Sequence, residues 1–211
     1  MNVSFILLGE GSSDLRLTEH IEQILIMEGF DEVSGDAPDL SMFVQPVGLT
    51  VRSKLEAVIK YYPSVDLIFI HRDADNAGVA AREQEILDAC SNLSLTAVVV
   101  PLVPVKMLEA WLLADQDKIK MVGGGKNYRG DIEGVPGVAA LENVRDAKSM
   151  LLNALCEVSG ASGGKLRAFK QRFPEMRARL TYDLDPDGPV NRLSSYRRFR
   201  QAVTQLAQQL L

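Results

Sequence analysis

The sequence has few cysteines and no long apolar run. Its 211 residues include only two cysteines, two histidines and one tryptophan. Cys90 and Cys156 are far apart in the chain and have no metal-ligand spacing, so we expect reduced, half-buried thiols, not a disulfide or a pair of metal ligands. No apolar run approaches the ~20 residues of a membrane-spanning helix. The run at 3–8 is also too short for the core of a signal peptide, so we expect a cytoplasmic protein without membrane contact.

Positive charge is scarce except in one stretch of the C-terminal third. The chain has 23 Lys and Arg against 28 Asp and Glu, a net charge of −5. Residues 165–200 carry ten of the basic and four of the acidic residues, so this stretch has a net charge of +6 and the remainder −11. The overall balance argues against a nonspecific nucleic-acid coat. The basic stretch can still contact phosphates, or it is an ordinary solvated helix surface.

Short apolar runs alternate with amphipathic stretches in the N-terminal half. The apolar runs predict strands at 3–8, 42–47, 65–70 and 95–100. Apolar residues at helical spacing predict helices at 14–28, 51–62 and 79–90. The acidic stretch at 31–40, with its Gly, Ser and Pro, predicts a loop. Strands that alternate with helices favour βαβ units around a parallel sheet, with helices on both faces.

The pattern changes after Val105 and becomes mostly helical. Helices are predicted at 106–114, at 141–158 and at the C-terminal end, and a glycine-rich loop at 122–138. We therefore expect a three-layer, Rossmann-like α/β domain with a parallel sheet at residues 1–118. Residues 119–211 should form a glycine-rich loop and a mostly helical extension packed on that domain.

Acidic residues follow two of the predicted strands. Glu10 and Gly11 come after the first strand, and Asp73-x-Asp75-x-x-Gly78 comes after the third. Ligands of open parallel sheets bind outside the carboxyl ends of the strands, so we expect these acids to meet at one edge. Hard oxygen ligands gathered in this way suit Mg²⁺ or Mn²⁺, with waters and a substrate phosphate completing the shell.

Each of these acids also has an ordinary structural explanation. Asp73 and Asp75 can belong to a turn that caps the next helix, and Glu10 can balance a helix dipole. Gly78 permits a close backbone approach or a positive φ. Asp14 stands where a dinucleotide-binding motif has its third glycine, and a carboxylate there argues against a bound pyrophosphate.

Other residues near the acids have two interpretations each. Glu109 is a further candidate ligand and Trp111 a candidate base-stacking platform; equally, an amphipathic helix with a core Trp and a surface Glu needs no function. Arg72 either neutralises the acids or contacts phosphate. His71 has no partner at a ligand spacing, so we expect a structural role for it.

The C-terminal tail contains four arginines around Tyr196. Arginine is well suited to phosphate recognition, so these side chains are candidates for nucleic-acid contact. The alternative is that Tyr196 and Phe199 pack inward while the arginines are solvated. The four candidates are Arg192, Arg197, Arg198 and Arg200.

Together, the E-G-x-x-D that begins at Glu10 and the D-x-D-x-x-G that begins at Asp73 resemble the TOPRIM superfamily. This is the catalytic domain of topoisomerases, primases and several nuclease families. The family has a glutamate after its first strand and D-x-D after a later one, and Glu10, Asp73 and Asp75 match that pattern. The resemblance covers residues 1–100.

A second segment is similar to one group of these proteins. The stretch from Glu109 to Asp115 resembles small stand-alone bacterial TOPRIM-like proteins, mostly of unassigned function, of which some serve in defence against phage. The chain lacks the domains that define topoisomerases and primases. It also lacks the ATPase domain of the overcoming-lysogenization-defect nucleases, which a separate chain could supply.

The resemblance implies Mg²⁺- or Mn²⁺-dependent phosphodiester cleavage of nucleic acid, as in a nuclease that acts as a defence or toxin effector. In the family, the glutamate is the general acid/base and the D-x-D binds the metal. Carried over, this makes Glu10 the catalytic residue, and Asp73, Asp75 and Glu10 the metal-site acids. Asp14, Glu109, Gly11 and Gly78 are secondary candidates.

Two other functions stay open. Some TOPRIM domains are noncatalytic and serve for binding or protein contacts. D-x-D after a strand also occurs in haloacid-dehalogenase-type phosphatases, where the first Asp is the nucleophile. There the motif usually ends the first strand and continues with Thr or Val, whereas here it follows the third predicted strand. The sequence does not decide the oligomeric state, so a homo-oligomer stays open too.

Overall fold

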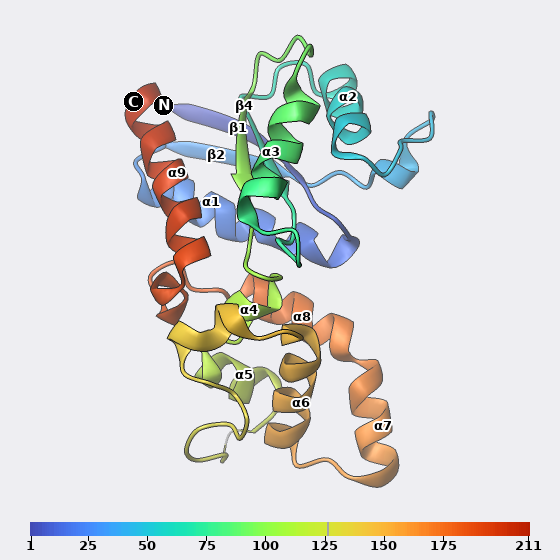
Figure 1. Cartoon of the computed structure of the whole chain (residues 1–211), viewed down its shortest axis with the longest axis vertical. Coiled ribbons are helices and arrows are strands. Elements are labelled where there is room, and N and C mark those ends of the chain that lie inside the picture. Colours follow the sequence, from blue (N-terminus) through green and yellow to red (C-terminus); the bar gives the residue numbers. More distant parts are fainter. Residues whose placement is uncertain (126) are drawn as a thin grey trace.

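The computed structural model describes residues 1–125 and 127–211, in which four strands form one parallel sheet (Figure 1). The order across the sheet is β2-β1-β3-β4, so each connection along the chain is a crossover. This confirms the predicted α/β class with a parallel, Rossmann-like sheet. The strands are β1 (Asn2–Leu8), β2 (Glu32–Asp36), β3 (Leu67–His71) and β4 (Val98–Leu102).

Helices cover both faces of the sheet and make three layers. The helices α1 and α9 pack on one face, whereas α2 and α3 pack on the other (Figure 1). The strand pleat separates the two cores, because successive side chains point to opposite faces. Phe5 of β1 faces the α1 side, and its neighbour Ile6 faces the α2 side. These helices are α1 (Leu17–Met27), α2 (Val51–Tyr61), α3 (Val79–Cys90) and α9 (Ser194–Leu210).

The other helices lie beyond the carboxyl ends of the strands, in the lower half of Figure 1. The apolar cluster on the α1 face of the sheet continues into them through Trp111, Leu155 and Leu180. The extension therefore shares its core with the sheet. Among the described residues, no helix is long and apolar enough to cross a membrane. The helices are α4 (Glu109–Leu112), α5 (Gln116–Val122), α6 (Ala147–Ser159), α7 (Gly163–Gln171) and α8 (Phe173–Tyr182).

Aromatic side chains join α4 to α9 beside the sheet. Trp111 is fully buried, and its Nε1 donates a hydrogen bond of 2.8 Å to Ser195 Oγ. The Tyr196 ring meets the Trp111 ring edge-on at 4.9 Å between centroids, and Phe199 stacks near it. The interpretation of Trp111 as a base-stacking platform is therefore wrong, because the core encloses the ring. The inward packing of Tyr196 and Phe199 is confirmed.

The second strand is not where the sequence predicted it. Residues 42–47 form no strand, and Val44 is 93% exposed. The strand is β2, which lies inside the predicted loop at 31–40 and pairs in parallel with β1, from Asn2↔Glu32 to Ile6↔Asp36. It is a short edge strand with exposed alternate residues, so pairing with β1 outweighs its weak strand composition.

Two predicted helices are shorter than expected. The helix predicted at 106–114 forms only at Glu109–Leu112, because the residues before it bind the loop after β3: the Lys106 carbonyl accepts from Asp75 N–H at 2.8 Å. The helix predicted at 141–158 begins at Ala147. Asp146 ends the preceding segment and caps α6 by accepting from Ser149 N–H at 2.9 Å.

Candidate functional site

The three main acids follow the ends of neighbouring strands. Leu8 pairs with Ile70 in the β1–β3 register, so Glu10 and Asp73 leave the sheet at the same carboxyl end. Partial burial raises the pKa of the Glu10 carboxyl, and the negative charges of Asp73 and Asp75 raise it further. Arg72 and His71 oppose the rise. Asp73 and Asp75 are therefore close enough to act on the Glu10 carboxyl.

Arginines partly neutralise two of these acids. Arg72 Nε lies 3.1 Å from Glu10 Oε1, which is the neutralising role considered for Arg72. Arg82 Nη2 lies 3.1 Å from Asp75 Oδ2. Both arginines also contact Glu85, at 3.3 and 2.9 Å. These ion pairs use one oxygen each of Glu10 and Asp75 and do not use the other.

The loop after β3 is fixed by backbone hydrogen bonds and by two unusual φ angles. Asp73 Oδ1 accepts from Leu108 N–H at 2.9 Å. Asp75 has φ of +48°, and Gly78 has φ of +85° at the start of α3. Glycine adopts such a φ without strain, which is the role expected for Gly78. The loop thus holds both aspartates in defined positions.

His71 lies between two carboxylates. Its Nδ1 is 3.3 Å from Asp14 Oδ2 and its Nε2 is 3.3 Å from Asp73 Oδ1. Both nitrogens must carry hydrogens to face two carboxylates, so the ring is an imidazolium. Burial alone would lower the pKa of His71, but the two carboxylates raise it to about 9. Both contacts fall outside full hydrogen-bond geometry, but at 3.3 Å the opposite charges still attract each other.

Arg177 of α8 extends this arrangement toward the helical part of the protein. Its Nη2 lies 3.0 Å from Asp14 Oδ1, and its Nε lies 2.7 Å from Glu109 Oε1. The three side chains are only 8%, 6% and 4% exposed. Burial alone would raise the pKa of Asp14. Instead, His71, Arg177 and the N–H of Gly11, 3.0 Å from Oδ2, hold it well below its usual range.

These five side chains form a line of alternating charge, here called the buried charge chain. Its members in order are Asp73, His71, Asp14, Arg177 and Glu109. It joins the loop after β3, the turn η1 (Ser12–Arg16), α8 and α4. Asp14 and Glu109 are thus buried ion-pair partners. The alternative of a solvated surface for Glu109 is wrong.

Sequence reasoning missed Arg177 and gave His71 no partner. A signal for Arg177 exists, because it falls at helical spacing within an apolar stripe that includes Phe173 and Leu180. An arginine inside such a stripe is buried and needs an acid partner. The partners themselves lie far away in the sequence, at Asp14 and Glu109, so no local pattern identifies them.

An open pocket of about 340 Å³ adjoins the buried charge chain. Pockets of this size can hold a small molecule or part of a polymer. Its lining combines acids, bases and apolar side chains from both parts of the molecule. The lining residues are Asp14, Asp73, Met107, Glu109, Lys148, Phe173, Pro174 and Arg177.

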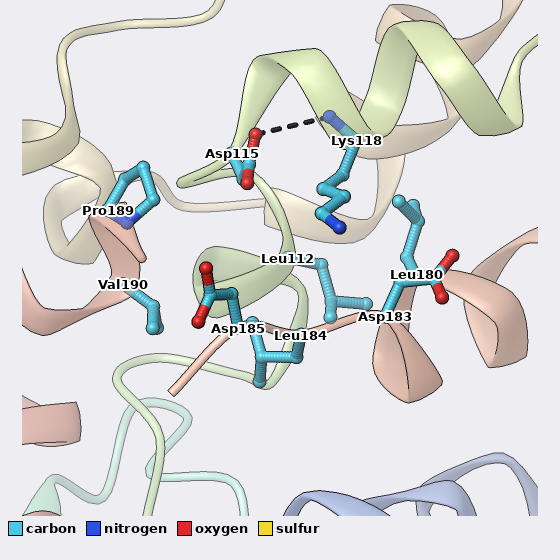
Figure 2. Close-up of a pocket in the computed structure, with 9 residues that line it drawn as sticks. All are labelled: Leu112, Asp115, Lys118, Leu180, Asp183, Leu184, Asp185, Pro189 and Val190. Carbon is cyan, nitrogen blue, oxygen red and sulfur yellow. Dashed lines mark hydrogen bonds between the residues drawn. The ribbon is translucent and has the colours of Figure 1, made fainter. Parts of the chain in front are cut away.

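A second hollow has three aspartates but little space. Figure 2 shows Asp115, Asp183 and Asp185 around it, and its volume is about 10 Å³. That is room for about one water molecule. Asp115 Oδ1 accepts from the Lys118 N–H at 3.1 Å, the dashed line in Figure 2, so it caps α5. We therefore place the candidate site at the larger pocket and the acids beside it: Asp73 lines this pocket, whereas Glu10 and Asp75 do not.

The arginines of the tail occupy α9 and the turn before it. Arg198 lies 3.3 Å from Glu83, and Arg200 lies 3.3 Å from Glu28. Arg192 and Arg197 are exposed. Two of the four predicted nucleic-acid contacts therefore already have an acid partner inside the molecule.

In the part of the chain that the structure describes, no group of three or more His, Cys, Asp or Glu side chains is arranged to hold a metal ion.

The comparisons with known proteins identify no relative. No family model, no curated protein and no solved structure significantly matches the chain.

Proposed function

We propose that the chain is a TOPRIM-like, divalent-metal-dependent enzyme that cleaves phosphodiester bonds in nucleic acid. The observation that carries the proposal is the electrostatic coupling of Glu10 with Asp73 and Asp75 at the carboxyl end of the sheet. Acids brought together at the place where α/β sheets bind ligands repel one another, and a bound cation would relieve the repulsion that Arg72 and Arg82 offset only in part.

The donor set fits Mg²⁺ or Mn²⁺. Mg²⁺ is usually bound by one or two carboxylates, with waters and substrate phosphate as the other ligands, so a cage of three protein ligands is not required. The contacts described above do not use Glu10 Oε2, Asp73 Oδ2 or Asp75 Oδ1. A bound ion would polarise the phosphoryl oxygen and screen the acids from the phosphate.

The chain's own residues supply proton transfer and positioning. Glu10 has a raised pKa, which brings its carboxyl closer to the range in which it can both accept and release a proton. Arg72 orients Glu10 through the contact at Oε1. His71 and the N–H of Leu108 both engage Asp73 Oδ1, so its other oxygen has a fixed direction.

The proposal also covers the cellular role of the enzyme and its partner chain. The family resemblance allows a cytoplasmic defence or toxin effector, with a separate ATPase chain as its partner. The substrate class follows from the resemblance and from the basic stretch at 165–200.

Cleavage of labelled nucleic acids tests the proposal. Single- and double-stranded DNA and RNA are incubated with Mg²⁺ or Mn²⁺ and the wild-type protein, Glu10→Gln or Glu56→Gln. Glu56 is an exposed acid of α2 that pairs with Arg52, so its variant is the matched control. We expect metal-dependent cleavage that Glu10→Gln lowers by roughly 10²–10⁴-fold. Equal cleavage by both variants would refute the role of Glu10.

A noncatalytic binding module is the second candidate. The ion pairs of Arg72 with Glu10 and of Arg82 with Asp75 favour it, because they partly compensate the acids without a metal. This candidate predicts metal-independent binding to nucleic acid or protein and no turnover with any member of the panel.

A further inference from the structure

The helix α7 differs from the rest of this acidic molecule. Residues 163–172 contain four basic residues and no acidic one, whereas the whole chain has a net charge of −5. Lys165, Arg167 and Lys170 are exposed and form no ion pair with any residue that the structure describes. Arg172, at the end of the helix, is 3.4 Å from Glu175. Three cations on α7 are therefore free to meet an external anion.

The surface of α7 contains an open groove. Arg167 and Lys170 are one helical turn apart and line the same open groove of about 450 Å³. Gly163, Leu166 and Gln171 complete its lining. The helix has 9 residues and is therefore about 13 Å long, which matches about four phosphates along one strand of a duplex.

The position of α7 connects this surface to the candidate site. In Figure 1, α7 and α8 follow one another along one side of the molecule, and α7 is the farther from the sheet. The first residues of α8, Phe173 and Pro174, line the pocket that also contains Asp73 and Arg177. A polymer that follows α7 toward α8 thus arrives at the pocket and at Asp73.

We infer that α7 is the surface that holds the phosphate backbone of a nucleic-acid substrate and leads it to the pocket. The inference rests on the proposed function and names its substrate-binding surface. It replaces the arginines of α9 in that role, because Arg198 and Arg200 contact Glu83 and Glu28. The remaining molecular surface is acidic on balance and repels a polyanion.

The salt dependence of binding tests the inference. Fluorescence anisotropy measures binding of labelled DNA and RNA from 50 to 200 mM salt, with Ca²⁺ in place of Mg²⁺. The α7 variant combines Lys165→Ala, Arg167→Ala and Lys170→Ala. The matched variant on α9 and the turn before it also removes three positive charges, by Arg192→Ala, Arg197→Ala and Arg198→Ala. Thermal melting checks that both variants fold.

The two variants should differ in how steeply their affinity for nucleic acid falls with salt concentration. Each neutralised phosphate contributes about −0.9 to the slope of log affinity against log salt for duplex DNA and about −0.7 for single strands. We expect the α7 variant to flatten the slope by about two units and the α9 variant by less than one. An unchanged slope in a folded α7 variant would overturn the inference.

Failure of the inference is distinguishable from failure of the proposed function. A wild-type protein that binds and cleaves nucleic acid, together with an unaffected α7 variant, refutes the inference alone. A wild-type protein that binds no nucleic acid at any salt concentration refutes both. Binding to phosphatidylserine vesicles in place of oligonucleotides, lost in the α7 variant, would also overturn the assignment of α7 to nucleic acid.

Discussion

At the scale of single residues, Arg177 connects α8 with two other segments of the structure. It is buried, it contacts Asp14 and Glu109, and its Nη1 is buried without a hydrogen-bond partner in the described part of the chain. The Arg177 side chain holds α8 against both α4 and the turn after β1. Removing it leaves the buried Glu109 without a counter-ion and Asp14 with His71 alone, which is costly in a medium of low polarity.

The first prediction concerns the contacts of Arg177 with Asp14 and Glu109. Arg177→Met should lower the free energy of unfolding by about 3 kcal/mol or more. Arg179→Met is the matched control on the same helix, because Arg179 is 59% exposed and pairs with Asp183. Its cost should stay within about 1 kcal/mol. Urea denaturation measures the free energy of unfolding of both variants. An equal loss of stability in the two would contradict a special role for Arg177.

The second prediction concerns the pH dependence that His71 introduces. Its folded-state pKa of about 9 is above the ordinary histidine value of 6.5, so the folded protein holds this proton more tightly than the unfolded chain. The resulting stability is complete below pH 6.5 and is lost as the pH rises through about 9. Its size is at most about 3 kcal/mol, from 1.36 kcal/mol per pKa unit.

Urea midpoints from pH 6 to 9.5 measure this effect in the wild type and in His71→Asn. The wild type should lose stability with rising pH. The variant should be less stable at pH 6 and nearly independent of pH over the same range. Parallel curves for the two proteins would show that His71 does not carry the charge.

At the scale of elements, the edge strand β2 depends on one glycine. Gly35 pairs with Phe5 of β1, and a Cβ at Gly35 would lie 2.2 Å from Phe5 Cζ. The Phe5 ring is buried and stands edge-on to Phe69 at 5.3 Å, so it cannot move aside easily. The residue that weakens the strand pattern in the sequence is thus the one that the packing requires.

The third prediction uses this close approach. Gly35→Ala should lower the free energy of unfolding by about 1–3 kcal/mol through overpacking. Gly164→Ala is the control, because a Cβ there meets no atom within 4 Å, and alanine should stabilise α7 by up to about 1 kcal/mol. Thermal melting compares the two variants. A neutral Gly35→Ala variant would show that the Phe5 ring can yield.

Elements with a local sequence pattern were predicted, whereas an element that depends on a distant pairing partner was missed. The helix α3 was predicted with its observed bounds of Val79–Cys90, because its pattern and its flanking Gly78 are local. The strand β2 was missed, because its five residues, EVSGD, become a strand only by pairing with β1. Local patterns identify elements with one apolar face, whereas an exposed edge strand depends on its neighbour.

At the scale of the whole molecule, the sequence predicted the class of sheet and the acids at its carboxyl end. It did not predict that the extension reaches those acids through Arg177 or that His71 connects Asp14 to Asp73. Such contacts join segments that are distant in the sequence, and the pairing depends on how helices pack in three dimensions. The site is therefore a property of the sheet and the extension together.

We propose that Glu10, Asp73 and Asp75 belong to one divalent-metal site, and Mn²⁺ binding tests this proposal most directly. Electron paramagnetic resonance counts free Mn²⁺ during titration of the wild type, Asp75→Asn and Asp88→Asn. Asparagine tolerates the positive φ at position 75, and Asp88 is an exposed acid of α3 that serves as control. We expect the wild type and Asp88→Asn to bind Mn²⁺ alike and Asp75→Asn to bind at least tenfold more weakly. Equal binding by all three proteins, or binding by none, would contradict the account.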